Sequence, residues 1–233
     1  MTLASAMSSF PYDAVLFDCD GVLVDSEAIT CSVLVQMLGE LGWTLTLPEA
    51  MATFVGKMVK DEAALIEART GFVLTEDWLA GFRARRDAAL AREIVAIPGA
   101  PAAVEAIHVL AGGRIAVASG ADRVKINLQL GKTGLAGWFE GRIFSGHEMP
   151  RSKPHPDVYL AAAAALGVDP RRCAVVEDTV TGARAGVAAG ATVFGYSPGG
   201  LGHSGAQALR AVGVARIFDD MGALASVLQS GAS

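Results

Sequence analysis

The sequence predicts an α/β protein in which a parallel sheet, covered by helices on both faces, is interrupted near its start by a small all-helical insert. Two observations support this prediction. From residue 97 onward, short Ala- and Val-rich runs without polar–apolar alternation are separated by helical patterns, which is typical of strands buried on both faces. Between residues 27 and 96 the chain has helical patterns and no comparable strand run.

The core is predicted to alternate strands with helices. The first strand is expected at 15–17, and Pro98-Gly99 returns the chain to the core after the insert. Parallel strands joined by helices imply a doubly wound, Rossmann-like sheet with right-handed crossovers. The other strands are expected at 114–118, 142–144, 173–176, 192–196 and 214–218, and the helices at 100–111, 122–130, 155–166, 180–189 and 221–228.

The insert is predicted to form a separate helical module. Helices are expected at 29–41 and 58–69, and Thr75 is expected to start a third, with acidic residues in its first turn. Gly42 and Gly71 are typical of helix ends. We therefore expect two domains, a core formed by 1–26 and 97–233 and a helical cap formed by 27–96.

The composition narrows the classes of function. A net charge of −5 gives no basic surface for nucleic acid, and no apolar run approaches the roughly 20 residues of a membrane helix. Three cysteines without C-x-x-C spacing predict neither a disulfide framework nor a thiolate metal site. Segment 1–11 lacks the features of a secretory signal and is expected to be a loose tail. We expect a cytoplasmic protein, a monomer or weak homodimer, that acts on a small molecule.

Two carboxylates follow the first predicted strand. Asp18 and Asp20 are two residues apart, so in extended backbone their side chains point to the same face, and Gly21 then allows a sharp turn. Adjacent buried carboxylates repel each other unless a proton or cation lies with them. An oxygen-rich site of this kind suits Mg²⁺. The alternative is an ordinary solvated turn, in which Asp and Gly are common.

Polar residues also follow other predicted strands, at the edge where ligands bind in parallel sheets. Ser119 and Gly120 precede a helix whose free N–H groups favour an anion. Lys153 lies in a proline-stiffened loop and suits a phosphate, and Glu177-Asp178 could anchor a cation. The alternatives are helix N-caps for Ser119 and the acids, and a solvated loop lysine for Lys153.

The motifs, taken together, resemble those of the haloacid dehalogenase superfamily, in the branch that contains β-phosphoglucomutase and small sugar phosphatases. The string Phe17-Asp-x-Asp-Gly-Val-Leu-Val-Asp-Ser-Glu27 is similar to motif I of that family. Ser119 after an apolar strand, Lys153-Pro-x-Pro-Asp157 and Val175-Val-Glu-Asp-Thr-x-x-Gly182 are similar to motifs II, III and IV. The helical insert lies where that branch carries its cap.

The resemblance implies a Mg²⁺-dependent phosphatase that forms an aspartyl-phosphate. It makes Asp18 the nucleophile and Asp20 the general acid and base, with Ser119 and Lys153 stabilising the transferring phosphoryl group. It implies that Mg²⁺ is held by Asp18, the Asp20 main-chain carbonyl and Asp178, with Glu177 in or near the metal's shell. The implied substrate contacts are Gly120 in the core and Gly56 in the cap, with Lys57 and Lys60 as candidates. The alternative for each lysine is a solvated residue at a helix start. The most similar subgroup acts on phosphorylated sugars and sugar acids, 6-phosphogluconate among them.

The nearest alternative is a phosphosugar mutase of the β-phosphoglucomutase type. That enzyme has a hinge histidine and a cap arginine where this chain has Thr30 and Val59. Because both groups take part in the mutase cycle, their absence favours phosphatase.

A second alternative comes from another class of protein. Segment 200–205 reads G-x-G-x-x-G after a predicted strand, and Asp219 follows at a suitable offset, as in nucleotide-binding modules. Ser197-Pro198-Gly199 separates the strand from the motif, and the remaining chain is too short for a full βαβαβ half. A third alternative, a catalytically idle binding protein, is disfavoured because the set of site residues is complete.

Overall fold

The computed structural model describes residues 10–231; most of the predicted N-terminal tail lies outside the described residues. Within them the chain forms one six-stranded sheet of order β3-β2-β1-β4-β5-β6, and all neighbouring strands are parallel. The predicted α/β class is therefore confirmed. The strands are β1 (Ala14–Phe17), β2 (Ile115–Ser119), β3 (Ile143–Ser145), β4 (Cys173–Glu177), β5 (Thr192–Tyr196) and β6 (Arg216–Phe218).

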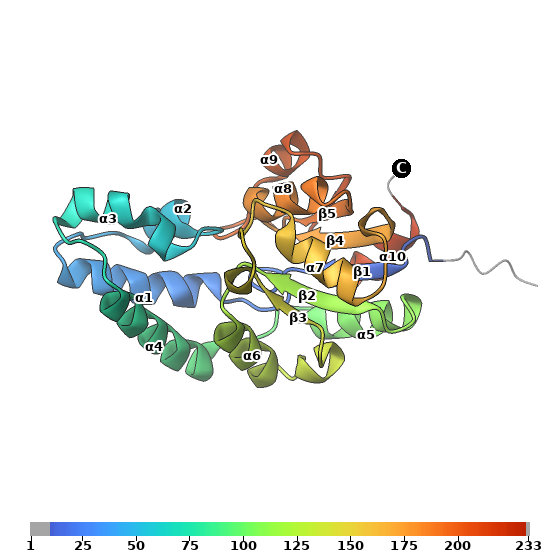
Figure 1. Ribbon diagram of the computed structural model, residues 1–233, viewed down its shortest axis with the longest axis horizontal. Coiled ribbons are helices and arrows are strands. Elements are labelled where there is room, and N and C mark those ends of the chain that lie inside the picture. The colour runs from blue at the N-terminus through green and yellow to red at the C-terminus, as the bar shows by residue number, and fades with distance from the viewer. Residues whose placement is uncertain (1–9, 232–233) are drawn as a thin grey trace, which may run out of the picture.

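Helices cover both faces of the sheet (Figure 1). Successive residues of β1 alternate between the faces, so that Val15 and Phe17 join one apolar cluster and Ala14 and Leu16 the other. This alternation explains why the strands are apolar throughout. One face is covered by α5 (Ala100–Leu110), α6 (Arg123–Lys132) and α10 (Leu224–Gln229), and the other by α7 (Asp157–Ala165), α8 (Val180–Ala188) and α9 (Ala206–Ala211).

The insert between β1 and β2 contains four α-helices, which lie at the left of Figure 1, away from the sheet. They share an apolar cluster that includes Leu34, Phe54, Ile66 and Phe82. We propose on this basis that 27–96 is a cap with its own core. The helices are α1 (Glu27–Glu40), α2 (Leu47–Phe54), α3 (Ala63–Thr70) and α4 (Glu76–Glu93).

The short helices α2 and α9 (Ala206–Ala211) were not predicted individually. Helix α2 begins with a capping box, in which Thr46 Oγ1 accepts the N–H of Glu49 and the Glu49 carboxylate accepts the N–H of Thr46. That signal is present in the sequence as Thr-x-x-Glu. The 3₁₀ turn Val59–Glu62 precedes α3, so the predicted 58–69 helix is α-helical only in its second half. Helix α9 directly follows the G-x-G-x-x-G segment.

The topology brings the predicted site residues together. Phe17 at the end of β1 is in register with Val117 of β2 and Val176 of β4. The residues just beyond, Asp18, Ser119 and Glu177, therefore lie at the same edge of the sheet. Strands β2 and β3 lie on one side of β1, and β4, β5 and β6 lie on the other. The strand order reverses next to β1, and the crevice at that point, beyond the carboxyl ends of the strands, is where such sheets bind ligands. In the described part of the chain, no helix is both long and apolar enough to cross a membrane.

Candidate active site

A cavity of about 370 Å³ lies between the cap helices and the carboxyl ends of the strands. Its wall includes side chains from α1, α4 and the Gly56–Glu62 region of the cap, together with the loops that follow β1, β2 and β3. Every residue predicted to be catalytic or to contact substrate lines this one cavity: Asp18, Asp20, Gly56, Lys57, Ser119, Gly120 and Lys153.

Lys153 is held by two carboxylates. Its Nζ donates to Asp18 Oδ1 at 2.9 Å and to Glu177 Oε1 at 2.6 Å, and Tyr159 donates its hydroxyl to the same Glu177 oxygen at 2.7 Å. Burial alone would lower the pKa of Lys153, but Asp18 and Glu177 outweigh it and raise the pKa. The alternative of a solvated loop lysine is therefore wrong. The ammonium group is charged, fixed, and next to the predicted nucleophile.

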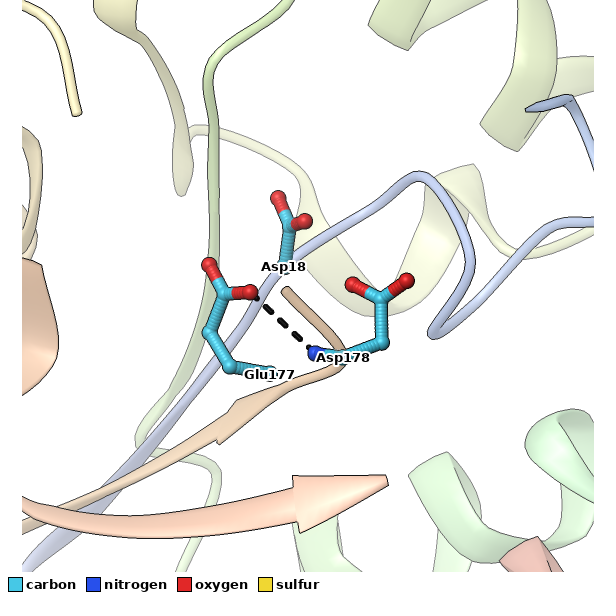
Figure 2. A group of neighbouring side chains, drawn as sticks. All are labelled: Asp18, Glu177 and Asp178. Atoms are coloured by element: carbon cyan, nitrogen blue, oxygen red, sulfur yellow. Dashed lines mark hydrogen bonds between the residues drawn. The ribbon is translucent and has the colours of Figure 1, made fainter. Parts of the chain in front are cut away.

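Asp18, Glu177 and Asp178 form a buried acidic group, in which one oxygen of each lies within 4.8 Å of the others (Figure 2). Burial, with the charges of Glu177 and Asp20 added, raises the pKa of Asp18 to about 7 despite the opposing effect of Lys153. Burial and the neighbouring carboxylates also raise the pKa of Asp178. Such a group is unfavourable unless a cation or protons neutralise it.

The donor set fits a hard divalent cation. Both carboxylate oxygens of Asp178 are buried and have no hydrogen-bond partner among residues 10–231. Glu177 differs, because Lys153 and Tyr159 occupy its Oε1 and the Thr179 hydroxyl and backbone N–H donate to its Oε2. Asp178 is therefore the better-suited metal ligand, while Glu177 mainly holds Lys153 in place.

Two glycines allow these acids to approach the backbone. A Cβ on Gly182 would lie 1.7 Å from Glu177 Oε1, and a Cβ on Gly21 would lie 2.2 Å from Asp178 Oδ2. Gly21 also has a φ of +73°, which favours glycine. The glycines of motifs I and IV are therefore required by the geometry of the acidic group.

Asp20 has surroundings of its own and is not part of the three-residue acidic group. Its Oδ1 accepts from Lys125 Nζ at 2.7 Å, from Gln129 Nε2 at 2.8 Å and from the Ser26 hydroxyl. Burial would raise the pKa of Asp20, but the Lys125 charge and these hydrogen bonds lower it to about 2. The coordination of metal through its main-chain carbonyl stays a prediction.

Ser119 ends β2 and is buried, and its Oγ accepts the backbone N–H of Ala121 at 3.0 Å. The N-cap of α6 is Asp122, so the alternative of Ser119 as the N-cap is wrong. Likewise Thr179, and neither Glu177 nor Asp178, caps α8. Ser119 and Gly120 instead line the cavity.

The cap contributes both charges and backbone to the cavity. Lys57 forms an ion pair with Glu62 at 3.2 Å, and its side chain remains 46% exposed. Lys60 also lines the cavity. Gly56 has a φ of +75°, and a Cβ there would lie 3.4 Å from Thr179 Cγ2, so the cap loop contacts motif IV of the core.

Several residues with polar groups at the site were not singled out from the sequence. Lys125 and Gln129 lie in the interior of α6, and a helical spacing of four was the only sequence signal that they share one face. Glu27 starts α1 and lines the cavity; burial first and the Asp20 charge second raise its pKa to about 7. Arg86 of α4 is buried and pairs with Asp122 of the core at 2.8 Å.

The G-x-G-x-x-G segment is bonded to the site loops. The Ser204 backbone N–H donates to the Asp178 carbonyl at 2.9 Å, and its Oγ accepts the N–H of Val180 at 3.0 Å. His203 Nε2 lies 3.1 Å from the Gly21 carbonyl. The following helix, α9, has six residues, which gives little of the aligned N–H array that a pyrophosphate needs. The geometry thus favours support of the acidic loops over nucleotide binding.

The fold and site are those of a haloacid dehalogenase-like hydrolase, and the model of that family matches residues 12–190, so the chain belongs to it. It resembles the 6-phosphogluconate phosphatase of Escherichia coli K12 with 34% identity over 78% of this chain and 81% of that protein. Hexitol phosphatase B of the same organism is 30% identical over 76% of this chain and 79% of that protein. These relatives support a phosphatase, as the sequence predicted.

Solved structures agree with this placement. A family hydrolase from Deinococcus radiodurans, with bound phosphate and sodium, has a TM-score of 0.77 and 39% identity, and covers 96% of this chain and 98% of its own. A β-phosphoglucomutase-like protein from Thermotoga maritima has a TM-score of 0.72 at 21% identity, covering 94% and 99%, and shows the shared fold alone.

Proposed function

We propose that this protein is a Mg²⁺-dependent phosphatase that hydrolyses a phosphorylated sugar or sugar acid, such as 6-phosphogluconate, through an aspartyl-phosphate. The observation that carries the proposal is the pairing of Asp18 with buried Lys153, next to an Asp178 carboxylate that has no hydrogen-bond partner in the described chain. The substrate class is supported by the names of the two E. coli relatives, and the reaction class by the phosphate found in the Deinococcus structure.

In the first step, Asp18 attacks phosphorus with Oδ2, because Oδ1 accepts a hydrogen bond from Lys153. The bond from phosphorus to the leaving oxygen breaks as that oxygen takes a proton from Asp20. Lys153 stabilises negative charge on the phosphoryl oxygens, together with the Ser119 hydroxyl and the Gly120 N–H.

In the second step, a water oxygen attacks the phosphorus of the aspartyl-phosphate and gives a proton to Asp20. The bond to Asp18 breaks, and inorganic phosphate leaves. Mg²⁺, held by Asp178 and Asp18 with the Asp20 carbonyl and near Glu177, would neutralise the acidic group and polarise phosphoryl oxygens. The cap supplies Gly56, Lys57 and Lys60 for substrate contact and excludes water from the cavity.

The test is phosphate release from a panel that includes 6-phosphogluconate, hexitol phosphates, phosphoglycolate and β-glucose 1-phosphate, with Mg²⁺ or with chelator. We expect release that requires Mg²⁺ and is fastest with one or a few sugar or sugar-acid phosphates. Equal release from all compounds would contradict the substrate class, and undiminished release in chelator would contradict the metal.

The same panel tests the mutase alternative. Thr30 and Val59, at the positions of the mutase histidine and arginine, both line the cavity and carry no charge. We expect no conversion of β-glucose 1-phosphate to the 6-phosphate when a bisphosphate primer is added. Conversion without net phosphate release would establish a mutase.

A further inference from the structure

The least expected feature of the site is a buried lysine of α6, Lys125, whose ammonium group contacts Asp20. The Lys125 side chain is 8% exposed, and its ammonium lies 2.7 Å from Asp20 Oδ1. Burying a lysine is unfavourable unless a partner compensates it, and Asp20 is the nearest carboxylate. Placement of a lysine here therefore indicates a specific role toward Asp20.

Gln129 lies one turn further along the same face of α6 and is fully buried. Its Nε2 donates to the same Asp20 oxygen at 2.8 Å, while its Oε1 accepts from the thiol of Cys19 at 3.6 Å. With its amide oxygen facing Cys19, Gln129 presents its NH₂ group to Asp20. The orientation of this amide is thus fixed from both ends.

The three donors all reach one oxygen. Lys125, Gln129 and Ser26 donate to Asp20 Oδ1, and Oδ2 has no hydrogen bond within residues 10–231. An oxygen that already accepts three hydrogen bonds has no lone pair left for a further donor. Because Asp20 lines the cavity, Oδ2 is the oxygen available to exchange a proton there.

We propose that Lys125 and Gln129 are positioning residues that fix the Asp20 carboxylate through Oδ1, so that Oδ2 carries the proton in both steps of the reaction. This inference rests on the proposed function. In the first step the Asp18–phosphorus bond forms, the bond to the leaving oxygen breaks, and the proton passes from Asp20 Oδ2 to that oxygen. In the second, the water–phosphorus bond forms, the Asp18–phosphorus bond breaks, and Oδ2 takes the proton from water.

The experiment compares two esters of similar size, phenyl phosphate and 4-nitrophenyl phosphate. The nitro group stabilises the departing phenolate, which then needs no proton, whereas phenolate itself benefits from one. The measured quantity is kcat/KM, which reports on steps up to release of the alcohol. A group that acts only through proton transfer affects phenyl phosphate and spares 4-nitrophenyl phosphate.

We expect Gln129→Leu, which keeps all charges, to lower kcat/KM for phenyl phosphate by about 10- to 100-fold, part of the 10²–10⁴ that general acid catalysis supplies. The value for 4-nitrophenyl phosphate is expected to fall less than about 3-fold, on the same reasoning. Lys125→Met is the second variant and should show the same selectivity; because it also removes a charge beside Asp20, Gln129→Leu decides where the two variants differ. Lys132→Met, at the exposed end of the same helix, is the matched control and should change neither value.

Asp20→Asn separates failure of this inference from failure of the proposed function. If Asp20→Asn shows the selectivity and the two α6 variants do not, the positioning role is wrong while the acid role stands. Equal losses for both esters in the α6 variants would also overturn it, since they indicate charge stabilisation or a structural role. If Asp20→Asn shows no selectivity, the acid role itself is wrong, and the inference falls with it.

Discussion

Each carboxylate at this site is distinguished by what bonds to it. Asp18 and Glu177 both accept hydrogen bonds from Lys153, and Asp20 accepts from three donors through Oδ1. The Asp178 carboxylate has no hydrogen-bond partner among the residues described. These surroundings push the pKa of Asp20 down to about 2 and that of Asp18 up to about 7. Without a cation, Asp20 is therefore ionised at pH 7 and Asp18 is partly protonated. A cation bound at the acidic group would favour the ionised form of Asp18, which is the form that attacks phosphorus.

Asp18→Asn tests the nucleophile. The amide cannot attack phosphorus, so phosphate release should fall by about 10⁴-fold or more, as for removal of other covalent nucleophiles. The fold should be kept, because the amide oxygen can still accept from Lys153. Turnover is measured with the best substrate of the panel, and folding by circular dichroism. Retained turnover in a folded variant would refute the assignment.

Asp178→Ala tests the metal site. The Mg²⁺ concentration for half-maximal activity should rise by at least about 10-fold, because the variant loses the proposed metal ligand. The oxygens of that carboxylate have no hydrogen bonds within residues 10–231 and are therefore free to bind the ion. In the wild type, Mg²⁺ should also raise Tm by binding the folded state, and this shift should disappear in the variant. An unchanged magnesium titration would remove Asp178 from the site.

At the scale of elements, the loops after the strands are fixed by one another. The loop after β5 bonds through Ser204 to the loop after β4, and through His203 to the turn after β1. Loops at the carboxyl ends of parallel strands can hold a site rigid only if their polar groups are satisfied in this way.

Ser204→Ala removes the acceptor of the Val180 N–H at the start of α8. We expect a loss of about 1 kcal/mol in the free energy of unfolding, the usual contribution of one hydrogen bond, measured by urea denaturation. Ser204→Thr keeps the hydroxyl and serves as control. NAD or ATP should not raise Tm in the wild type; a clear rise would instead support the nucleotide-binding alternative.

At the scale of the molecule, the cap and the core are joined across the cavity by an ion pair. Arg86 of α4 bonds to Asp122 Oδ2 at 2.8 Å, while Oδ1 of the same carboxylate caps α6 by accepting from the N–H of Lys125. One aspartate therefore connects the cap with the helix that carries Lys125 and Gln129. Burial would raise the pKa of Asp122, but the N–H of Lys125 and the Arg86 charge lower it overall.

Asp122→Asn should remove the ion pair and keep the cap, because asparagine is also a good N-cap. We expect the free energy of unfolding at pH 7 to fall by about 1–3 kcal/mol, the contribution of a hydrogen bond to a charged group. Asp122→Ala should cost about 1 kcal/mol more, since it also removes the helix cap. No loss in Asp122→Asn would show that the ion pair contributes nothing, and an equal loss in both variants would show that the helix cap contributes nothing.

The contribution of this ion pair should depend on pH with a definite sign. The folded-state pKa of Asp122 lies below its ordinary value of 3.8, so the stabilisation is present above that pH and is lost as the pH falls through the folded pKa. The difference between wild type and Asp122→Asn should therefore be constant from pH 6 to 7 and shrink below about pH 4. A difference that grows toward low pH would contradict this account.

Local patterns in the chain were enough to predict the sheet, the helical insert and the order of the four motifs. Apolar strands with polar residues at their ends can be recognised in the sequence, and in a parallel sheet those ends must meet at one edge. This rule places Asp18, Ser119, Lys153 and Asp178 together without any knowledge of their contacts.

The bonding between those groups depends on the folded chain. Glu177 holds Lys153, and Lys125 and Gln129 reach Asp20, although no local pattern indicates either arrangement. Lys125 and Gln129 lie more than 100 positions from Asp20 and inside a helix, where a lysine or glutamine ordinarily faces solvent. Their partner is therefore set by how α6 packs against the end of β1, which is a property of the tertiary structure alone.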